Sequence, residues 1–221
     1  MKLKLAKKEL VASNIMTFWF EPEIQISRIA GQYTQLYIPH PDMDERKDKR
    51  WFTISSSPTE KLWSVTTKLD PVRKSTFKTT LLSLKPDDII NAQLPMGDFV
   101  LPKDTSLPLV FVAGGIGITP YRSILQFLSD TKEKRDITLI YAVNETAEIA
   151  FSDIIKASGV KFISHAGRLN STHILDYVKT GKDRIIYLSG PEHMVENLQK
   201  GLLSAGIKEE LIRTDFFHNY D

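Results

Sequence analysis

The stretch Arg50–Pro58, RWFTISSSP, combines a strand-forming pattern with an unusual set of polar side chains. Its aromatic and β-branched residues favour a β-strand, yet its nine positions also hold one cation and four hydroxyl residues. On an alternating strand, Arg50 and Phe52 share one face, while Trp51 and Thr53 share the other. A half-buried strand has little need of a cation and so many hydroxyls, so the stretch indicates a binding function.

The composition around this stretch is that of an ordinary globular chain and excludes several classes of function. Among 221 residues, 29 basic and 27 acidic side chains leave a net charge of +2, so no nucleic-acid partner is expected. The absence of cysteine excludes disulfides and thiolate-bound iron–sulfur clusters. The five histidines are scattered, and we expect no metal site. The longest apolar stretch, LPLVFVAGGIGI, is too short to span a bilayer, and we expect a cytoplasmic protein.

The first half of the chain reads as short strands separated by turns. The candidate strands are KLKLAKKELV, IMTFWFEP, GQYTQLYIP, RWFTISSSP and KLWSVTTKL. Such spacing is typical of an antiparallel barrel or sandwich. One helix is expected in STFKTTLLSLKPDD, where Ser75 is a suitable N-cap, apolar residues recur at helical spacing from Phe77 to Leu84, and Pro86 marks the end.

After LPKDTSLP the pattern changes to apolar strands that alternate with helices. The strands are PLVFVA, DITLIYAVN, VKFISHA and DRIIYLSG, and the helices are centred on YRSILQFL, FSDIIKAS, STHILDYVK and PEHMVENLQKGLLSAG. This alternation predicts a parallel α/β sheet. We therefore expect two domains, an antiparallel β-barrel with one helix over residues 1–103 and an α/β domain over residues 104–221.

A glycine-rich turn, VFVAGGIGITP, follows the first apolar strand of the second half. Glycines allow a ligand to approach the backbone, and the start of the next helix offers free N–H groups to a phosphate. Gly114, Gly115 and Gly117 form the expected loop, Thr119 is a further donor, and Pro120 starts the helix. The proline replaces the third glycine of the GxGxxG fingerprint. A tight turn without a ligand is the alternative.

Two further strand ends predict contacts with the same nucleotide. YAVNETAEIAF places Asn144 and Glu145 where dinucleotide-binding sheets meet the adenosine ribose, and the absence of an arginine there favours NADH over NADPH. An ordinary polar loop explains Glu145 nearly as well. In YLSGPEHMVENL, Gly190 permits close approach and Pro191 opens a helix. Because this turn is expected beside the first glycine loop, the two turns are predicted to hold one extended ligand.

The stretch Arg50–Pro58 has the groups that a flavin nucleotide requires. These are a cation for the phosphate, an aromatic for the ring face and a hydroxyl near ring nitrogen N5. One to three residues along a strand cover about 3–10 Å, comparable with the span from a flavin phosphate towards its ring. A surface strand with a stray arginine and a buried aromatic is the alternative interpretation.

RWFTISSSP also resembles the flavin-binding signature of the ferredoxin–NADP reductase superfamily, Arg-x-(Tyr/Phe)-(Ser/Thr). Other segments resemble that superfamily's motifs, in the same order along the chain: GQYTQLYIP, VTTK, STFKTTLLSLKPDD, PMGDFVLP, GGIGITP, SGPEHM and DFFHNYD. Each is weak alone, but the ordered set across both halves is specific. The resemblance implies a flavin-binding barrel followed by a nucleotide-binding domain, with FAD as the default cofactor and FMN as the alternative.

The resemblance implies roles for residues on the flavin side. Arg50 would contact the flavin phosphate, Phe52 would pack against the isoalloxazine ring, and Thr53 would hydrogen-bond near N5. The remaining candidates of this half are Trp51 within the signature, Thr67 and Lys68 along the ribityl or diphosphate chain, and Ser75 and Thr76 as caps of the phosphates.

On the nucleotide side, the resemblance implies that GGIGITP and SGPEHM bind NADH or NADPH, with Met194 in the second motif. Ser189 stands where many members have cysteine, and with Thr53 it is expected beside the reacting atoms. Phe216, Phe217 and Tyr220 are candidates to shield the flavin face that nicotinamide uses, or they pack the C-terminus onto the domain. Asp215 lies near a glutamate of some members, and its role stays open.

The implied activity is an FAD-dependent NAD(P)H oxidoreductase, in which hydride passes from nicotinamide to flavin N5. Because the sequence has no cysteine, it has no iron–sulfur domain, and electrons must leave to a separate acceptor such as a ferredoxin, a flavodoxin or another redox protein. The charged loop HPDMDERKDKR offers cations to an acidic partner, although a solvated loop is the simpler explanation. The alternatives are an electron-transfer subunit with little activity alone and a nucleotide-binding protein without flavin.

Overall fold

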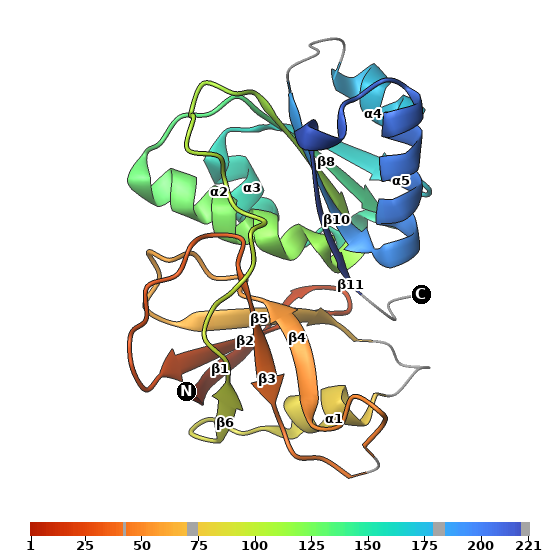
Figure 1. The fold of residues 1–221 in the computed structure, drawn as a ribbon. Helices are drawn as coiled ribbons and strands as arrows, with labels where there is room; N and C mark the ends of the chain where they lie inside the picture. The colour runs from red at the N-terminus through yellow and green to blue at the C-terminus, as the bar shows by residue number, and fades with distance from the viewer. Residues whose placement is uncertain (42, 70–74, 179–183, 218–221) are drawn as a thin grey trace.

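The chain forms two sheets that follow one another in sequence, as the computed structural model shows for residues 1–41, 43–69, 75–178 and 184–217 (Figure 1). The first sheet is antiparallel and consists of β1 (Lys2–Ala12), β2 (Ile15–Pro22), β3 (Tyr33–Tyr37), β4 (Lys49–Thr53), β5 (Trp63–Lys68) and β6 (Ile89–Ala92). The second is parallel and consists of β7 (Leu109–Gly114), β8 (Ile137–Val143), β9 (Lys161–Ala166), β10 (Ile185–Pro191) and β11 (Ile212–Phe217). The predicted two-domain fold is confirmed.

The antiparallel sheet has the strand order β4-β3-β6-β1-β2-β5 and curls until its two outer strands meet. A single bridge between Ile54 and Val65 joins them, next to a hydrogen bond from Ser55 N to the Ser64 carbonyl of 2.8 Å. Apolar side chains of the strands fill the interior, among them Phe18, Phe20, Leu36, Phe52, Trp63 and Val65. The result is a barrel whose core lies inside one closed sheet.

Helix α1 (Thr76–Ser83) covers one end of this core, at the place expected from the sequence. Ser75 is its N-cap, because the Ser75 hydroxyl accepts the Lys78 N–H at 3.4 Å. Phe77 and Leu81 are fully buried against the barrel interior. The helix is therefore fixed by its apolar face, and its first turn stays at the rim of the barrel.

The parallel sheet has the order β11-β10-β7-β8-β9. Helices α2 (Thr119–Thr131) and α3 (Ser152–Ser158) contribute to one apolar core, and α4 (Ser171–Val178) and α5 (Glu192–Ser204) to another. Short 3₁₀ helices lie at η1 (Gly115–Ile118), η2 (Thr146–Glu148) and η3 (Glu209–Leu211). Strand β11 was not expected from the sequence. Within the described ranges, no helix has the length and apolar character needed to cross a membrane.

The segment 93–108 connects the two sheets, and the expected boundary between residues 103 and 104 falls within it. Phe99 of this segment packs in the α/β core, with ring centroids 5.1 Å from Tyr187 and 5.8 Å from Tyr121. The Tyr187 hydroxyl donates to the carbonyl of Val100 at 2.8 Å. The connection is thus packed onto the second domain.

Helix α2 fastens the second domain to the barrel. The Arg122 guanidinium donates to the Ser55 carbonyl at 3.1 Å and forms an ion pair with Glu60. The Ser123 hydroxyl donates to the Ser56 carbonyl at 2.8 Å. These contacts connect the two domains at the end of the stretch Arg50–Pro58.

Candidate functional site

The carboxyl ends of the central parallel strands face the barrel. Turn η1, which follows β7, lies against β5 of the barrel. Turn η2, which follows β8, is held by a hydrogen bond from Ser13 N to the Ala147 carbonyl of 3.2 Å. In α/β sheets, ligands bind outside the carboxyl ends of the strands. The predicted nucleotide loops therefore lie along the boundary between the two domains.

The first glycine loop is a tight turn from β7 into α2. Gly115 has a backbone φ of +51°, which favours glycine, and open space surrounds the position of its missing side chain. A Cβ on Gly117 would instead lie 2.1 Å from the carbonyl oxygen of Ser189. Thr119 is buried, and its hydroxyl donates to the Ile116 carbonyl at 3.1 Å, so this expected ligand donor is engaged within the turn. Pro120 opens α2 as expected.

The second turn, Ser189–Pro191, lies directly beside the first because β10 pairs with β7. A Cβ on Gly190 would lie 3.3 Å from backbone atoms of Gly114. The Met194 side chain fills the space beside Gly114, where a Cβ would lie 2.2 Å from its sulfur. The small residues of the two turns thus serve to pack the turns against each other.

Ser189 and Asp215 form a buried polar pair at this edge. The Ser189 hydroxyl donates to the Asp215 carboxylate at 3.2 Å, and the two residues are register partners in β10 and β11. Burial raises the pKa of Asp215 to about 6, against the opposing effect of the Ser189 hydrogen bond. A carboxyl group with such a pKa exchanges a proton near neutral pH.

The C-terminal aromatic residues follow in the same register. Phe216 pairs with Gly190 and leaves 41% of its surface exposed beside the second turn. Phe217 pairs with Pro191, and its side chain is outside the described part of the structure. Tyr220 lies outside the described residues. Of the three predicted shields, Phe216 is therefore the one whose position beside the nucleotide turns can be described.

The side chain of Arg50 extends from strand β4 to the first turn of α1. Its guanidinium is 5.0 Å from the Phe77 ring, and only 11% of its side chain is exposed. It donates to the carbonyls of Lys47 and Lys49 at 3.0 and 2.6 Å, and to the Asp44 carboxylate at 2.8 Å. Burial, followed by repulsion from Arg46, lowers the pKa of Arg50 from its usual value. The predicted phosphate cation and the helix start that Ser75 caps are therefore neighbours.

The other residues of the signature occupy different environments. Phe52 faces the barrel core, where 5% of it is exposed and its ring stacks on Phe77 at 6.0 Å. Strand alternation explains this position, because Phe52 shares the inward face with Arg50. The exposed aromatic ring of β4 is Trp51, which packs edge-on against Tyr33 at 5.3 Å. The exposed ring of this strand is thus that of Trp51, while the contact of Phe52 with a flavin ring stays a prediction.

Thr53 ends β4 and is the signature residue with an uncommitted hydroxyl. It is 4% exposed, and among the described residues its hydroxyl has no hydrogen-bond partner. Its oxygen is not one of the fully buried polar atoms that lack a partner, so it is accessible to a ligand. Together with Arg50 at the start of α1, it makes the barrel side of the site fit a flavin nucleotide.

The serines that follow Thr53 have a structural role instead. The Ser55 hydroxyl is 2.9 Å from that of Ser64 and 2.8 Å from that of Thr66, and Thr66 is bonded in turn to Thr17 at 2.9 Å. All four residues are buried. The run of hydroxyls in RWFTISSSP therefore closes the barrel and does not extend the expected binding surface.

Lys68 bridges the two domains. Its ammonium group is 2.7 Å from the Glu148 carboxylate, and its carbonyl accepts a hydrogen bond of 2.9 Å from Lys78 of α1. Thr67, beside it in β5, is buried. Glu148 was not identified from the sequence, because its partner lies eighty positions away along the chain.

The predicted ribose contacts lie just before Glu148. The second carboxylate oxygen of Glu148 accepts the Asn144 N–H at 3.3 Å. Asn144 and Glu145 are exposed beside this contact. An ion pair to the barrel thus holds the loop in which both residues lie.

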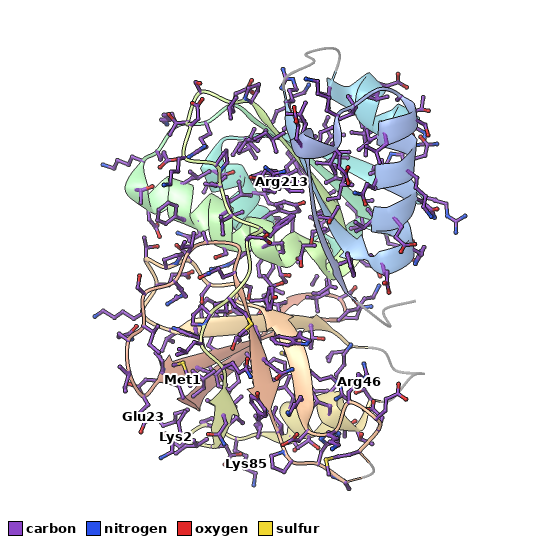
Figure 2. All side chains as sticks on the ribbon, viewed as in Figure 1. Met1, Lys2, Glu23, Arg46, Lys85 and Arg213 are labelled. Carbon is purple, nitrogen blue, oxygen red and sulfur yellow. The ribbon has the colours of Figure 1, made fainter. Side chains whose placement is uncertain are left out.

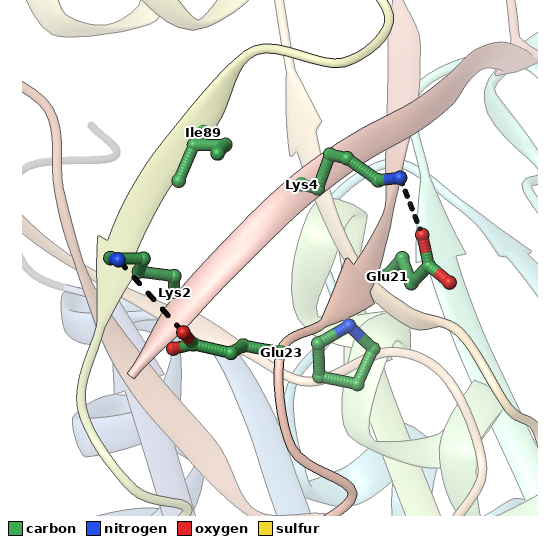
Figure 3. A pocket seen from close by; sticks show the side chains of 6 residues that line it. Lys2, Lys4, Glu21, Glu23 and Ile89 are labelled. Carbon is green, nitrogen blue, oxygen red and sulfur yellow. Dashed lines mark ion pairs between the residues drawn. The ribbon is translucent and has the colours of Figure 1, made fainter.

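A separate surface hollow lies on the barrel and plays no part in this arrangement (Figure 3). It is lined by Lys2, Lys4, Glu21, Pro22, Glu23 and Ile89. Its charges are paired, since Lys4 meets Glu21 at 2.8 Å and Lys2 meets Glu23 at 3.8 Å. Within the described residues, no group of three or more histidine, aspartate or glutamate side chains is placed to hold a metal ion.

Known proteins match this arrangement over both domains. The family model of the oxidoreductase NAD-binding domain matches residues 111–162. Flavohemoprotein A of Dictyostelium discoideum is 24% identical over 93% of this chain and 57% of its own length. An Amycolatopsis cytochrome P450 reductase has a TM-score of 0.83 at 20% identity, covering 100% of this chain and 71% of its own. A ferredoxin-NADP+ reductase from Plasmodium falciparum has a TM-score of 0.79 at 18% identity, covering 98% and 95%.

These likenesses establish the two-domain fold. The chain spans 57–60% of the length of the curated relatives that it matches, as flavohemoproteins and a dioxygenase reductase component show. The match is spread across the barrel and the α/β domain, because it covers 93% of this chain in the first of these relatives.

Proposed function

We propose that this chain is a member of the ferredoxin–NADP reductase superfamily and an FAD-dependent NAD(P)H oxidoreductase that passes electrons to a separate acceptor. The barrel binds the flavin, and the α/β domain binds NADH or NADPH. FAD is the expected cofactor, with FMN as the alternative.

The observation that carries this proposal is the position of two matched half-sites at one domain boundary. On the barrel, the Arg50 guanidinium lies beside the first turn of α1, and the Thr53 hydroxyl has no hydrogen-bond partner among the described residues. On the sheet, the turns at Gly114–Ile118 and Ser189–Pro191 pack together beside Phe216. Because η1 lies against β5, the two half-sites face one another.

The residues of the chain bind and orient the reactants. A flavin supplies the chemistry of hydride acceptance and onward electron delivery when bound. Arg50 and the first amides of α1 anchor its phosphate by charge and hydrogen bonds. The nucleotide turns place the nicotinamide end of NAD(P)H near Ser189, and this proximity lowers the barrier. The Asp215 carboxyl accepts the hydrogen bond of Ser189 and fixes that hydroxyl.

The electron acceptor belongs to another molecule in this proposal. Among the similar proteins are a cytochrome P450 reductase and the reductase component of terephthalate 1,2-dioxygenase of Comamonas sp. By analogy, we propose a redox protein such as a ferredoxin, a flavodoxin or an oxygenase as the acceptor. A second candidate function, an electron-transfer subunit of a larger complex, is favoured by the likeness to the reductase component of a dioxygenase.

The test is the visible absorption spectrum of the purified protein, before and after anaerobic addition of NADH and then NADPH. We expect a flavin spectrum that one of the two nucleotides bleaches. Arg50→Ala should lose about 30-fold in flavin affinity, because charge-assisted hydrogen bonds to a phosphate are lost. Lys49→Ala, which removes the neighbouring exposed cation, is the matched control. A colourless protein that cannot be loaded with flavin would refute the proposal.

Turnover separates the two candidate functions. Repeated reduction of ferricyanide by the flavin-loaded chain alone supports the autonomous reductase. Reduction of the flavin without multiple turnovers supports the electron-transfer subunit.

A further inference from the structure

The loop before β4 contains a carboxylate that holds two arginines together. Asp44 Oδ2 accepts a hydrogen bond from the terminal nitrogen of Arg46 at 2.6 Å and from that of Arg50 at 2.8 Å. The Nε of Arg46 donates to the same oxygen at 3.1 Å. Two guanidinium groups, four positions apart in the chain, therefore converge on one oxygen atom.

This convergence takes place next to the first turn of α1. The guanidinium of Arg50 lies 5.0 Å from the ring of Phe77, the second residue of that helix. Figure 2 shows Arg46 on the α1 side of the barrel. An anion between the two arginines would also lie near the N-terminal end of the helix, which favours negative charge.

Two positive guanidinium groups this close together are stabilised by a negative group between them. Repulsion from Arg46 contributes to lowering the pKa of Arg50, so the cations oppose each other unless a negative group separates them. The hydrogen bond from Arg46, with smaller contributions from its backbone N–H and from both arginine charges, lowers the pKa of Asp44 to about 2. Asp44 is therefore a carboxylate at every physiological pH.

Asp44 is better placed to leave than Arg50. Its side chain is 41% exposed, whereas that of Arg50 is 11% exposed and is also fixed by two backbone carbonyls. A phosphate offers more negative charge and more acceptor oxygens than a carboxylate, and arginine binds it through paired N–H groups. A carboxylate and a phosphate on the same nitrogen would repel each other.

We propose that Asp44 is an internal substitute for the cofactor phosphate, and that Arg46 joins Arg50 as a second phosphate ligand once the phosphate displaces Asp44. The inference rests on the proposed flavin-binding function and adds two residues to it. Asp44 then competes with the cofactor and sets how tightly the flavin is held. The shared chemistry is a phosphate group, either the monoester of FMN or the diphosphate of FAD.

The test compares three flavins on the full chain stripped of cofactor. Riboflavin lacks the phosphate, so it reports binding of the ring alone, while FMN and FAD report the phosphate contribution. Dissociation constants come from flavin fluorescence titrations at one fixed, low salt concentration. The variants are Asp44→Asn and Arg46→Gln.

The matched control is Glu45→Gln, which removes the same charge from the same loop. Among the described residues, Glu45 forms no ion pair with either arginine. It should leave all three constants within about twofold of the wild-type values, because exposed charges interact weakly.

Asp44→Asn should tighten binding of FMN or FAD by about tenfold, because the competing charge is gone. Arg46→Gln should weaken the same flavin by about tenfold, because one phosphate ligand is lost. Neither variant should change riboflavin affinity. The flavin with the larger response identifies the phosphate group that the site accepts.

Two other results would each overturn the inference, on different grounds. If Asp44→Asn binds FMN and FAD no more tightly than wild type while riboflavin binds normally, Asp44 orients Arg50 or is a bystander, and the inference is wrong. If the wild-type chain binds none of the three flavins, the proposed function itself fails and the inference falls with it.

Discussion

Arg50 and Arg122 are both largely buried, with 11% and 6% of their side chains exposed, but their surroundings differ. Arg122 is held by fixed groups of the barrel, namely the Ser55 carbonyl and the Glu60 carboxylate, and its guanidinium lies over Trp19 at 5.2 Å. Arg50 is neutralised by Asp44, which lies in a largely exposed loop.

The difference shows how one residue type serves structure in one place and binding in another. A cation of one domain whose partners are fixed parts of the other domain holds the two together. A cation whose counter-charge is exposed keeps its capacity to exchange that partner for a ligand. Two other pairs show the same contrast between a packed and an open position. Gly117 packs against the Ser189 backbone while Gly115 faces open space. Asp215 is buried beside Ser189 while Asp44 is partly exposed, so each pair offers an experiment.

The arginine pair should give the largest effect. Arg122→Ala should lower the free energy of unfolding by about 3 kcal/mol, because it leaves the Glu60 carboxylate unpaired at the domain boundary. Arg50→Ala should lower it by about 1 kcal/mol or less, because its ion pair is partly exposed. Urea denaturation of the two variants measures both values. Equal losses would remove the distinction between the two arginines.

The glycine pair should give the next effect. Gly117→Ala should destabilise the protein by about 2–3 kcal/mol, because the new methyl group would meet the Ser189 carbonyl oxygen, which is backbone and cannot turn away. Gly115→Ala should cost about 1 kcal/mol through its positive φ alone. Thermal unfolding checks the order. The Michaelis constant for NADH should rise more in Gly117→Ala, and the opposite ranking would contradict the packing of the two turns.

The aspartate pair should give a smaller effect, with opposite signs. The pKa of Asp215 is about 6 in the folded chain and 3.8 in the usual case, so the folded state binds its proton more tightly. Its contribution to stability is therefore complete below about pH 4 and is lost as the pH rises through 6. Asp215→Asn should remove this loss and stabilise the protein by about 1–2 kcal/mol at pH 7.5.

Asp44 should behave in the opposite way. Its pKa is lowered to about 2, so its contribution is present above pH 4 and is lost only as the pH falls towards 2. Thermal unfolding at pH 4.5, 6 and 7.5 separates the two aspartates, with Asp44→Asn as the control. If Asp215→Asn showed the wild-type slope between pH 4.5 and 7.5, the buried pair with Ser189 would not be the source.

Local pattern was enough to predict much of this molecule. The alternation in IMTFWFEP and KLWSVTTK marks barrel strands, and the apolar runs at Leu109–Gly114 and Ile137–Val143 mark the buried parallel strands. Ser75 caps α1 as its hydroxyl and its place before Phe77 suggest. The two glycine turns meet because strand order brings the ends of β7 and β10 together.

Contacts between residues that are far apart in the chain could not be predicted from the sequence. The Ser55 hydroxyl is hydrogen-bonded to that of Ser64, and the Ser56 hydroxyl accepts a hydrogen bond from Arg28. Nothing in RWFTISSSP reveals these partners. The burial of the Phe52 ring in the barrel core was likewise not evident from the strand, and its contact with a flavin stays a prediction. Strand β11 was missed because its residues pair only with β10, and its sequence, IRTDFF, has no regular alternation of apolar and polar residues.

The closure of the barrel has a consequence of its own. Between β4 and β5 the backbone is joined by one bridge and one neighbouring hydrogen bond, and rotatable hydroxyls of Ser55, Ser64 and Thr66 supply the rest. The barrel can therefore open between β4 and β5 with the loss of few backbone hydrogen bonds. This sparsely paired seam begins where Thr53 ends β4, so it adjoins the proposed flavin-binding surface.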